Sequence, residues 1–261
     1  MDIRQSFHAF LNAPFAESLD KDFEAARAAL EGAELPATLQ AVLEGIASEK
    51  EHMAFARKAG LFLSAALQAL RADQTLDLSV LGEDIRLDCL GACNRGPSLS
   101  VKGDVGNYAG AHMEAGTLTI EGDAEDYAGA GMKGGVIQIK GLAENHLGHS
   151  MAGGEIVVAR NGHDFIGNSM TGGHIVVRAN AGYSAGYRML GGLIEIQDLT
   201  WDLCGEEMVG GRITVGGHIG HDLGFSMVGG ELGLNEKNEG AQRTKAGGGK
   251  LVILKKGKKS A

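Results

Sequence analysis

The chain has 261 residues, including 42 glycines and only 3 prolines, and its hydrophobic content of 44% is too high for a disordered protein. Its net charge of −9 argues against general binding to nucleic acids or to anionic membranes. With only 3 cysteines, no apolar run of ~18 residues and no apolar segment typical of a signal peptide, we expect a cytoplasmic protein without membrane helices.

Residues 1–75 are predicted to form a helical N-terminal segment. Only three glycines precede position 80, whereas the other 39 follow it, so the composition changes sharply at this boundary. Asp20 is a plausible N-cap of one helix, and Gly32 is a plausible stop signal after it. Short helices are marginal in isolation, so this segment needs a surface against which to pack.

A second helical stretch is expected to start at Pro36, because proline suits the first turn of a helix. Apolar residues then recur at helical spacing as far as Arg71. An unbroken helix of ~35 residues would span roughly 52 Å. We therefore expect a break near Gly45 to Ser48 or at Gly60.

Residues 76–254 contain a repeat of 19 residues. Seven of the nine methionines are spaced by this interval, and each follows a glycine by three residues. A glycine pair follows the methionine in every copy except the first. Two alternating aliphatic residues come next in every copy. The methionines are Met113, Met132, Met151, Met170, Met189, Met208 and Met227, and the aliphatic positions run from Leu118 and Ile120 to Leu232 and Leu234.

A period of 19 residues is too short for a strand and a helix in two layers, and it suits one coil of a parallel β-helix. The alternating aliphatic residues predict a short strand with one face inward, and the methionines predict an internal column. The glycines mark corners that need a positive φ or a close backbone approach. Polar residues six positions before the methionine should help to close a turn; they are Asn107, Asp126, Asn145, Asp164 and Asp202.

The pattern continues more weakly at both ends, which predicts about nine coils. Asn94 replaces the methionine in the first coil, whereas Gly248 and Gly249 keep the glycine pair in the last. A degenerate first coil is typical of a capped solenoid end, so we expect the helices to pack there or on the adjoining flank, or to dock a partner subunit. Residues 255–261 are expected to form a basic, flexible tail.

At this point the motifs GNYAGAHMEAG, DYAGAGMKGG, GHDFIGNSMTGG and DLGFSMVGG resemble a known family. It is the G-x-G-x-G β-helix family, which includes the C subunit of formylmethanofuran dehydrogenase, its relatives in formyltransferase/hydrolase complexes and the C-terminal domain of the glutamate synthase large subunit. The resemblance covers residues 84–254 and implies a mainly β fold, a right-handed parallel β-helix. The helical residues 1–75 are a departure from the C subunit.

The resemblance implies a non-catalytic scaffolding subunit of a formylmethanofuran-dehydrogenase-like oxidoreductase complex in one-carbon metabolism. Molybdopterin or tungsten and iron–sulfur centres would then lie on partner subunits, with no cofactor on this chain. Two alternatives stay open. One is a glutamate-synthase-type module that couples amidotransferase and synthase subunits, and the other is an independent enzyme or ligand-binding solenoid.

No catalytic, cofactor or metal site is predicted on this chain. The histidines of the repeats occupy scattered phases, whereas a ladder of metal ligands would repeat one phase. Among the histidines, His146 and His149 with His163 of the next coil come nearest to a metal cluster. We expect these histidines to lie on the surface or in turns.

The other candidate ligands are also expected to be structural. Cys89 and Cys93 lie four residues apart, six coils away from Cys204, and zinc or an iron–sulfur cluster needs about four ligands. Glu49 and His52 have the spacing of half a di-iron site, but the matching half is missing. The glycine-rich turns lack the helix that phosphate binding requires.

Two files of apolar residues are predicted to face outward from consecutive coils, and we expect them to contact a partner or the N-terminal helices. The first contains Val136, Val157, Val176 and Leu193, and the second contains Leu190, Val209 and Val228. Glu155 with His174, and Arg212 with Glu231, should form surface pairs.

Overall fold

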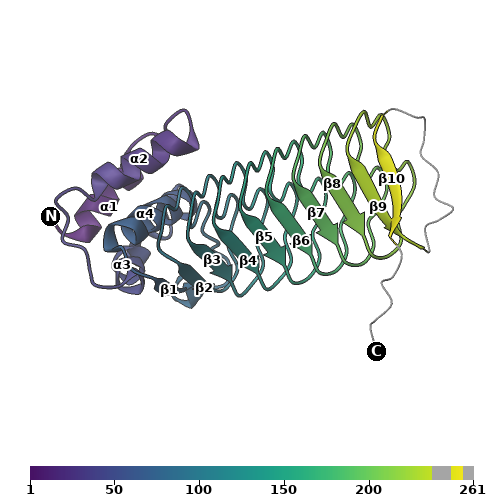
Figure 1. Cartoon of the computed structure of the whole chain (residues 1–261). Coiled ribbons are helices and arrows are strands. Elements are labelled where there is room, and N and C mark those ends of the chain that lie inside the picture. The colour runs from purple at the N-terminus through teal and green to yellow at the C-terminus, as the bar shows by residue number, and fades with distance from the viewer. Residues whose placement is uncertain (237–247, 255–261) are drawn as a thin grey trace.

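The computed structural model describes residues 1–236 and 248–254, and its main body is a β-solenoid of ten parallel strands in chain order (Figure 1). Each strand pairs with the strand one coil on. Leu118 thus pairs with Ile137, Ile137 with Ile156, and Ile156 with Ile175. The mainly β fold is confirmed. The strands are β1 Gln74–Asp77, β2 Leu99–Lys102, β3 Thr117–Ile120, β4 Val136–Ile139, β5 Glu155–Val158, β6 His174–Val177, β7 Leu193–Ile196, β8 Arg212–Val215, β9 Glu231–Asn235 and β10 Lys250–Leu254.

The helical N-terminal segment is confirmed, with four α-helices: α1 Ile3–Asn12, α2 Leu19–Ala29, α3 Leu39–Ile46 and α4 Phe55–Leu70. Short 3-10 helices follow at Ala47–Glu49 (η1) and Leu78–Leu81 (η2). The expected break near residues 45–48 is therefore present. No helix in the described part of the chain has the length and apolar character needed to cross a bilayer.

Two of the predicted helix starts are wrong. Ser18, not Asp20, caps α2, because the helix begins at Leu19 and the Ser18 hydroxyl accepts the N–H of Lys21. The next helix begins three residues after Pro36, where the Thr38 hydroxyl accepts the N–H of Ala41. A hydroxyl cap thus determines both starts.

Gly60 lies inside α4 and does not break it. A Cβ at Gly60 would lie 1.8 Å from the carbonyl oxygen of Asp88, in the first coil, so glycine permits a close backbone approach. Hydrogen bonds flank this contact: the Ser64 hydroxyl donates to Cys89 O (3.2 Å) and Gln68 Nε2 donates to Cys93 O (2.8 Å). The helices therefore pack on the N-terminal end of the solenoid, as predicted (Figure 1).

The solenoid begins earlier than the repeat pattern indicates. Strand β1 lies across the predicted boundary between the helical segment and the repeats, and it pairs with β2 from Gln74 opposite Leu99 to Asp77 opposite Lys102. Its sequence lacks the glycine and methionine phases, so no repeat marks it. The tail at residues 255–261 lies outside the described residues, and its predicted flexibility stays a prediction.

The methionine column lies inside the solenoid, as predicted, and all seven side chains are fully buried. The second glycine of each pair follows from this packing: a Cβ at Gly192 would lie 2.7 Å from Met170 Cε of the preceding coil. The same contact recurs at 2.6–2.8 Å in every repeat from Gly135 to Gly249. Glycine here makes room for the methionine. The φ of +81° to +92° at this position also favours glycine over other residues.

The polar residues six positions before the methionine act between coils. The Asp164 carboxylate accepts the N–H of Tyr183 (2.8 Å), which is the residue at the same phase in the next coil. Asp126, Asn145 and Asp202 make the equivalent contact at 2.9, 3.2 and 2.7 Å. The prediction that side-chain oxygens support this turn is confirmed at these four positions, with the partner one coil on. At the fifth, the Asn107 amide donates to the carboxylates of Asp88 and Glu125.

Two positions of each coil adopt a left-handed conformation with residues other than glycine, apart from Gly131. Five residues before the methionine, Tyr108, Tyr127, His146 and Phe165 have φ of 59–62°. One residue before the methionine, His112, Ser150 and several others have φ of 51–58°. Bulky side chains rarely adopt this conformation, so the coil geometry overrides local preference at both positions.

Candidate functional site

The three histidines named as a possible metal cluster do not form one. His146 is stacked between Tyr127 (4.6 Å between ring centroids) and Phe165 (5.0 Å). His149 lies perpendicular to His146 at 6.1 Å, and His163 pairs with Glu144 at 2.5 Å. Burial and the neighbouring His146 lower the pKa of His149, so its imidazole favours the neutral form. These rings support the coil stack.

Two of the three cysteines are core residues. Cys89 and Cys204 are buried, and burial raises the pKa of each thiol to about 12. The third, Cys93, lies at the boundary between the helices and the solenoid and is treated below. Glu49 pairs with His8 Nδ1 at 3.3 Å, and His52 lies in a turn after η1, so these two do not form half of a di-iron site.

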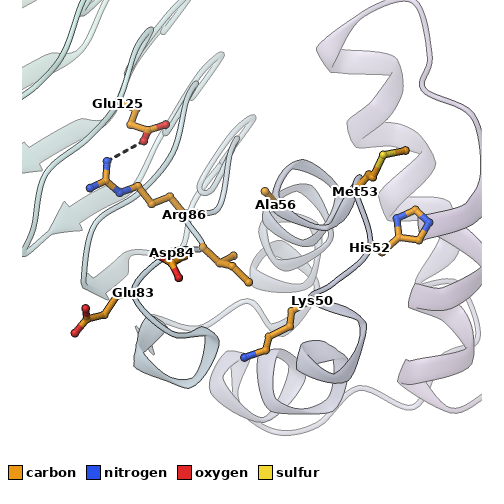
Figure 2. Close-up of a pocket in the computed structure, with 9 residues that line it drawn as sticks. Lys50, His52, Met53, Ala56, Glu83, Asp84, Arg86 and Glu125 are labelled. Atoms are coloured by element: carbon orange, nitrogen blue, oxygen red, sulfur yellow. Dashed lines mark hydrogen bonds and ion pairs between the residues drawn. The ribbon is translucent and has the colours of Figure 1, made fainter.

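A pocket of about 560 Å³ opens between the helices and the first coils (Figure 2). Lys50 and His52 line it from the turn before α4, and Arg86 lines it from the loop that leads into the first coil. Arg86 contacts Glu125 (2.8 Å) and Asp104 (3.3 Å), and Lys50 Nζ donates to Leu81 O. Its cations are therefore already paired or hydrogen-bonded, and the pocket is a polar boundary between the two parts of the chain.

A second polar cluster lies beside this boundary and contains Asp20, Cys93 and His112. His112 Nδ1 lies 2.8 Å from Asp20 Oδ1, and Cys93 Sγ lies 3.6 Å from the same oxygen. The hydrogen bond from His112 lowers the pKa of Asp20, whereas burial, with Asp20 nearby, raises the pKa of the Cys93 thiol to about 12. One candidate ligand atom from each residue lies within 4.8 Å of the others.

The sequence analysis missed this cluster. Asp20 is 73 residues from Cys93 and 92 from His112. The sequence predicts that the helices pack at this end of the solenoid, but not that α2 is the helix beside these two residues. One signal was present: Cys93 and His112 are 19 residues apart and share the phase before the methionine position. This shared phase is not visible when the histidines alone are compared between coils, because the matching residue is a cysteine.

The outward apolar file after the methionine is exposed, as predicted. Leu190, Val209 and Val228 are 53%, 48% and 60% exposed on three consecutive coils. The same position in the preceding coils holds Glu114, Lys133, Ala152 and Thr171, all exposed. The file therefore changes along the solenoid from charged to small and then to aliphatic, and its apolar part is confined to the C-terminal half.

The outward residues of the strands form a less exposed surface. Val136, Val157, Val176 and Leu193 are half-buried, and Val157 faces Val176 across neighbouring strands. The predicted surface pairs are present, with His174 at 3.7 Å from Glu155 and Arg212 at 3.3 Å from Glu231. The charged pairs divide the valines into short stretches, so this face is less apolar than the Leu190 file.

The comparisons agree with the repeat. The family described as "GXGXG motif" matches residues 91–255. None of the curated proteins is similar enough in sequence to count as a relative. Among solved structures, the chain is similar to one from the formyltransferase/hydrolase complex (FhcABCD) of Methylorubrum extorquens, which was determined with methylofuran. The identity is 28% and the TM-score is 0.46; the match covers 69% of this chain and 58% of that chain.

Proposed function

Because the chain belongs to the GXGXG motif family, we propose that it is a non-catalytic scaffolding subunit of a hetero-oligomeric oxidoreductase complex. The complex would be of the formylmethanofuran-dehydrogenase or formyltransferase/hydrolase type. Redox cofactors, namely molybdopterin or tungsten and iron–sulfur centres, would lie on partner subunits. The chain spans 58% of the length of the similar chain from the formyltransferase/hydrolase complex.

The apolar file of Leu190, Val209 and Val228 carries the proposal. A monomeric protein has no need to expose aliphatic side chains at the same position of three consecutive coils, and such a contiguous patch is typical of a protein interface. The same position is charged near the N-terminal end, so the coil itself does not require an apolar residue there. The sequence thus concentrates an interface on one end of the solenoid.

The interior of the solenoid supports a structural role. Buried methionines and aliphatic residues fill it, and five surface pockets lie around the helices and the first coils. The pocket of Figure 2 contains paired charges without a nucleophile–base pair. A rigid rod with a filled core suits the positioning of other subunits better than the binding of a substrate.

Purification of the tagged full chain from its native source tests the proposal. We expect stoichiometric partner subunits, with molybdenum or tungsten and iron detected by elemental analysis and assigned to those partners. Flavin and a glutaminase subunit in the purified complex would favour the glutamate-synthase-type module. A lone chain with an activity of its own would overturn the scaffolding role.

A further inference from the structure

Asp20, Cys93 and His112 come from three different places in the fold. Asp20 lies in the first turn of α2, Cys93 in the first coil and His112 in the second. Their candidate ligand atoms nevertheless lie within 4.8 Å of one another. The donors are a carboxylate oxygen, a sulfur and an imidazole nitrogen, which is a set that borderline metal ions such as Zn²⁺ bind in proteins.

The coil geometry aims two of these side chains at the same point. Cys93 and His112 share a phase of the repeat and adopt φ of 54° and 55°. The Cys93 N–H donates to Ala111 O (2.8 Å), which holds the two coils in register beside the cluster. Gly131, next in the same file, makes room for the imidazole, because a Cβ there would lie 2.7 Å from His112 Cδ2.

The repeat position that holds Cys93 and His112 carries neither a cysteine nor a histidine in the later coils. After Gly131, the phase holds Ser150, Ser169, Arg188, Glu207 and Ser226. A thiol and an imidazole thus occur only on the two coils that α2 reaches. This coincidence is not required for folding, since serine occupies the same left-handed position elsewhere, with φ of 54–58°.

We infer that Asp20, Cys93 and His112 form a zinc-binding site that joins α2 to the first two coils of the solenoid. Binding releases the thiol proton of Cys93 to solvent, and the neutral His112 ring carries its proton on Nε2 so that Nδ1 binds the metal. A solvent molecule completes the tetrahedral coordination. Tetrahedral ligands at ~2.0–2.3 Å from zinc are about 3.3–3.8 Å apart. The Cys93–Asp20 separation of 3.6 Å already fits, and the His112–Asp20 pair must open by about half an ångström.

The surroundings suit a metal with one open position. A small cavity of about 190 Å³ adjoins the cluster, lined also by Glu114, Lys133 and Arg95. Glu114 contacts both cations, at 3.2 Å from Arg95 and 3.6 Å from Lys133, and so partly neutralises them beside the site. The inference revises the expectation of a metal-free chain, and it does not depend on the proposed scaffolding function.

A titration of the metal-free full chain with Zn²⁺ and with Co²⁺ tests the site. We expect one Zn²⁺ per chain and, with Co²⁺, a sulfur-to-cobalt charge-transfer band in the near ultraviolet. Saturating Zn²⁺ should also raise the melting temperature by several degrees, because a ligand that binds only the folded state stabilises it. Loss of any one ligand should weaken Zn²⁺ binding by at least about 100-fold.

The repeat supplies mild variants for this test. Cys93→Ser and His112→Ser introduce the residue that three other coils carry at the same position, so both variants should fold. His163→Gln is the matched control, because it removes a histidine that pairs with a carboxylate away from any cysteine. The inference is wrong if the Co²⁺ complex lacks the sulfur band, or if Cys93→Ser binds Zn²⁺ as tightly as His163→Gln does. In either case the cluster is a hydrogen-bonded contact only.

Discussion

Replacing Gly60 by alanine tests how the helices are joined to the solenoid. Alanine favours a helix interior over glycine by about 1 kcal/mol, so propensity alone predicts a more stable protein. In this structure the new Cβ would lie 1.8 Å from Asp88 O, whereas real Cβ contacts essentially never fall below 3.0 Å. Helix α4 must therefore move away from the first coil by at least about an ångström.

Such a displacement strains four hydrogen bonds across the same contact. Ser64 Oγ donates to Cys89 O and accepts the N–H of Gly91, Gln68 Nε2 donates to Cys93 O, and the Asp88 N–H donates to Ala56 O, at 2.8–3.2 Å. At about 0.5–1.5 kcal/mol each, their loss would cost about 2–6 kcal/mol. After the gain in propensity of about 1 kcal/mol, we expect Gly60→Ala to lower the free energy of unfolding by about 1–5 kcal/mol.

Chemical denaturation followed by circular dichroism measures this effect, with Gly45→Ala as the matched control. Gly45 also lies inside a helix, but a Cβ there would meet only Ile3 Cγ2 at 3.4 Å, an ordinary contact. Gly45→Ala should therefore be neutral or stabilise by up to about 1 kcal/mol. Equal stabilisation by both variants would refute the close approach of α4 to the first coil.

Three further predictions concern buried groups. Met170→Asp places a charge in the buried methionine column and should lower the free energy of unfolding by several kcal/mol. Met170→Leu is the control and should cost less than about 1.5 kcal/mol. An unchanged melting temperature for the aspartate variant would contradict an inward methionine column. The thiols of Cys89 and Cys204 should react with a thiol reagent more than about 1000-fold more slowly in the native chain than after unfolding, because burial raises the pKa of each to about 12; rapid reaction of the native chain would show that these side chains are accessible. Buried Lys58 donates to Phe10 O (2.8 Å), and burial lowers its pKa below the ordinary 10.5, so the unfolded chain binds this proton more tightly. The free energy of unfolding relative to Lys58→Met should therefore rise with pH between that lowered pKa and 10.5, and denaturation at several pH values would reveal a constant difference if the lysine were solvated.

The solenoid was predictable because its restraints repeat. Every coil must place a methionine and two aliphatic residues inward, and the second glycine of each pair must leave room for the methionine of the preceding coil. Each requirement therefore appears in the sequence at intervals of 19. Strand β1 was not predicted, because it pairs with β2 through its backbone without these side chains. The left-handed residues such as Tyr127 were not predicted either, since stacking on neighbouring coils stabilises them.

The candidate sites were less predictable for a physical reason. The exposed file of Leu190 could be read from the sequence, because it follows the repeat. The cluster of Asp20, Cys93 and His112 depends on where α2 lies against the solenoid. Helix α2 packs on α4, which contacts the first coil through Gly60 and Ser64. These contacts occur once, so no periodicity reveals them.

The scaffolding role is tested most directly by changing the apolar file and measuring partner retention. Thr171 occupies the same position natively, so Leu190→Thr, Val209→Thr and Val228→Thr together should leave the fold and melting temperature nearly unchanged. Removing these apolar contacts should cost about 3–4 kcal/mol of binding, or about 100- to 1000-fold in affinity.

The measurement is the amount of each partner subunit retained by the tagged chain during purification from the native source, with Ala152→Thr as the control at the same position of an earlier coil. We expect the wild type and the control to retain stoichiometric partners and the triple variant to lose them. Full retention by a folded triple variant, or a wild-type chain that purifies alone, would contradict a scaffold that binds through this file.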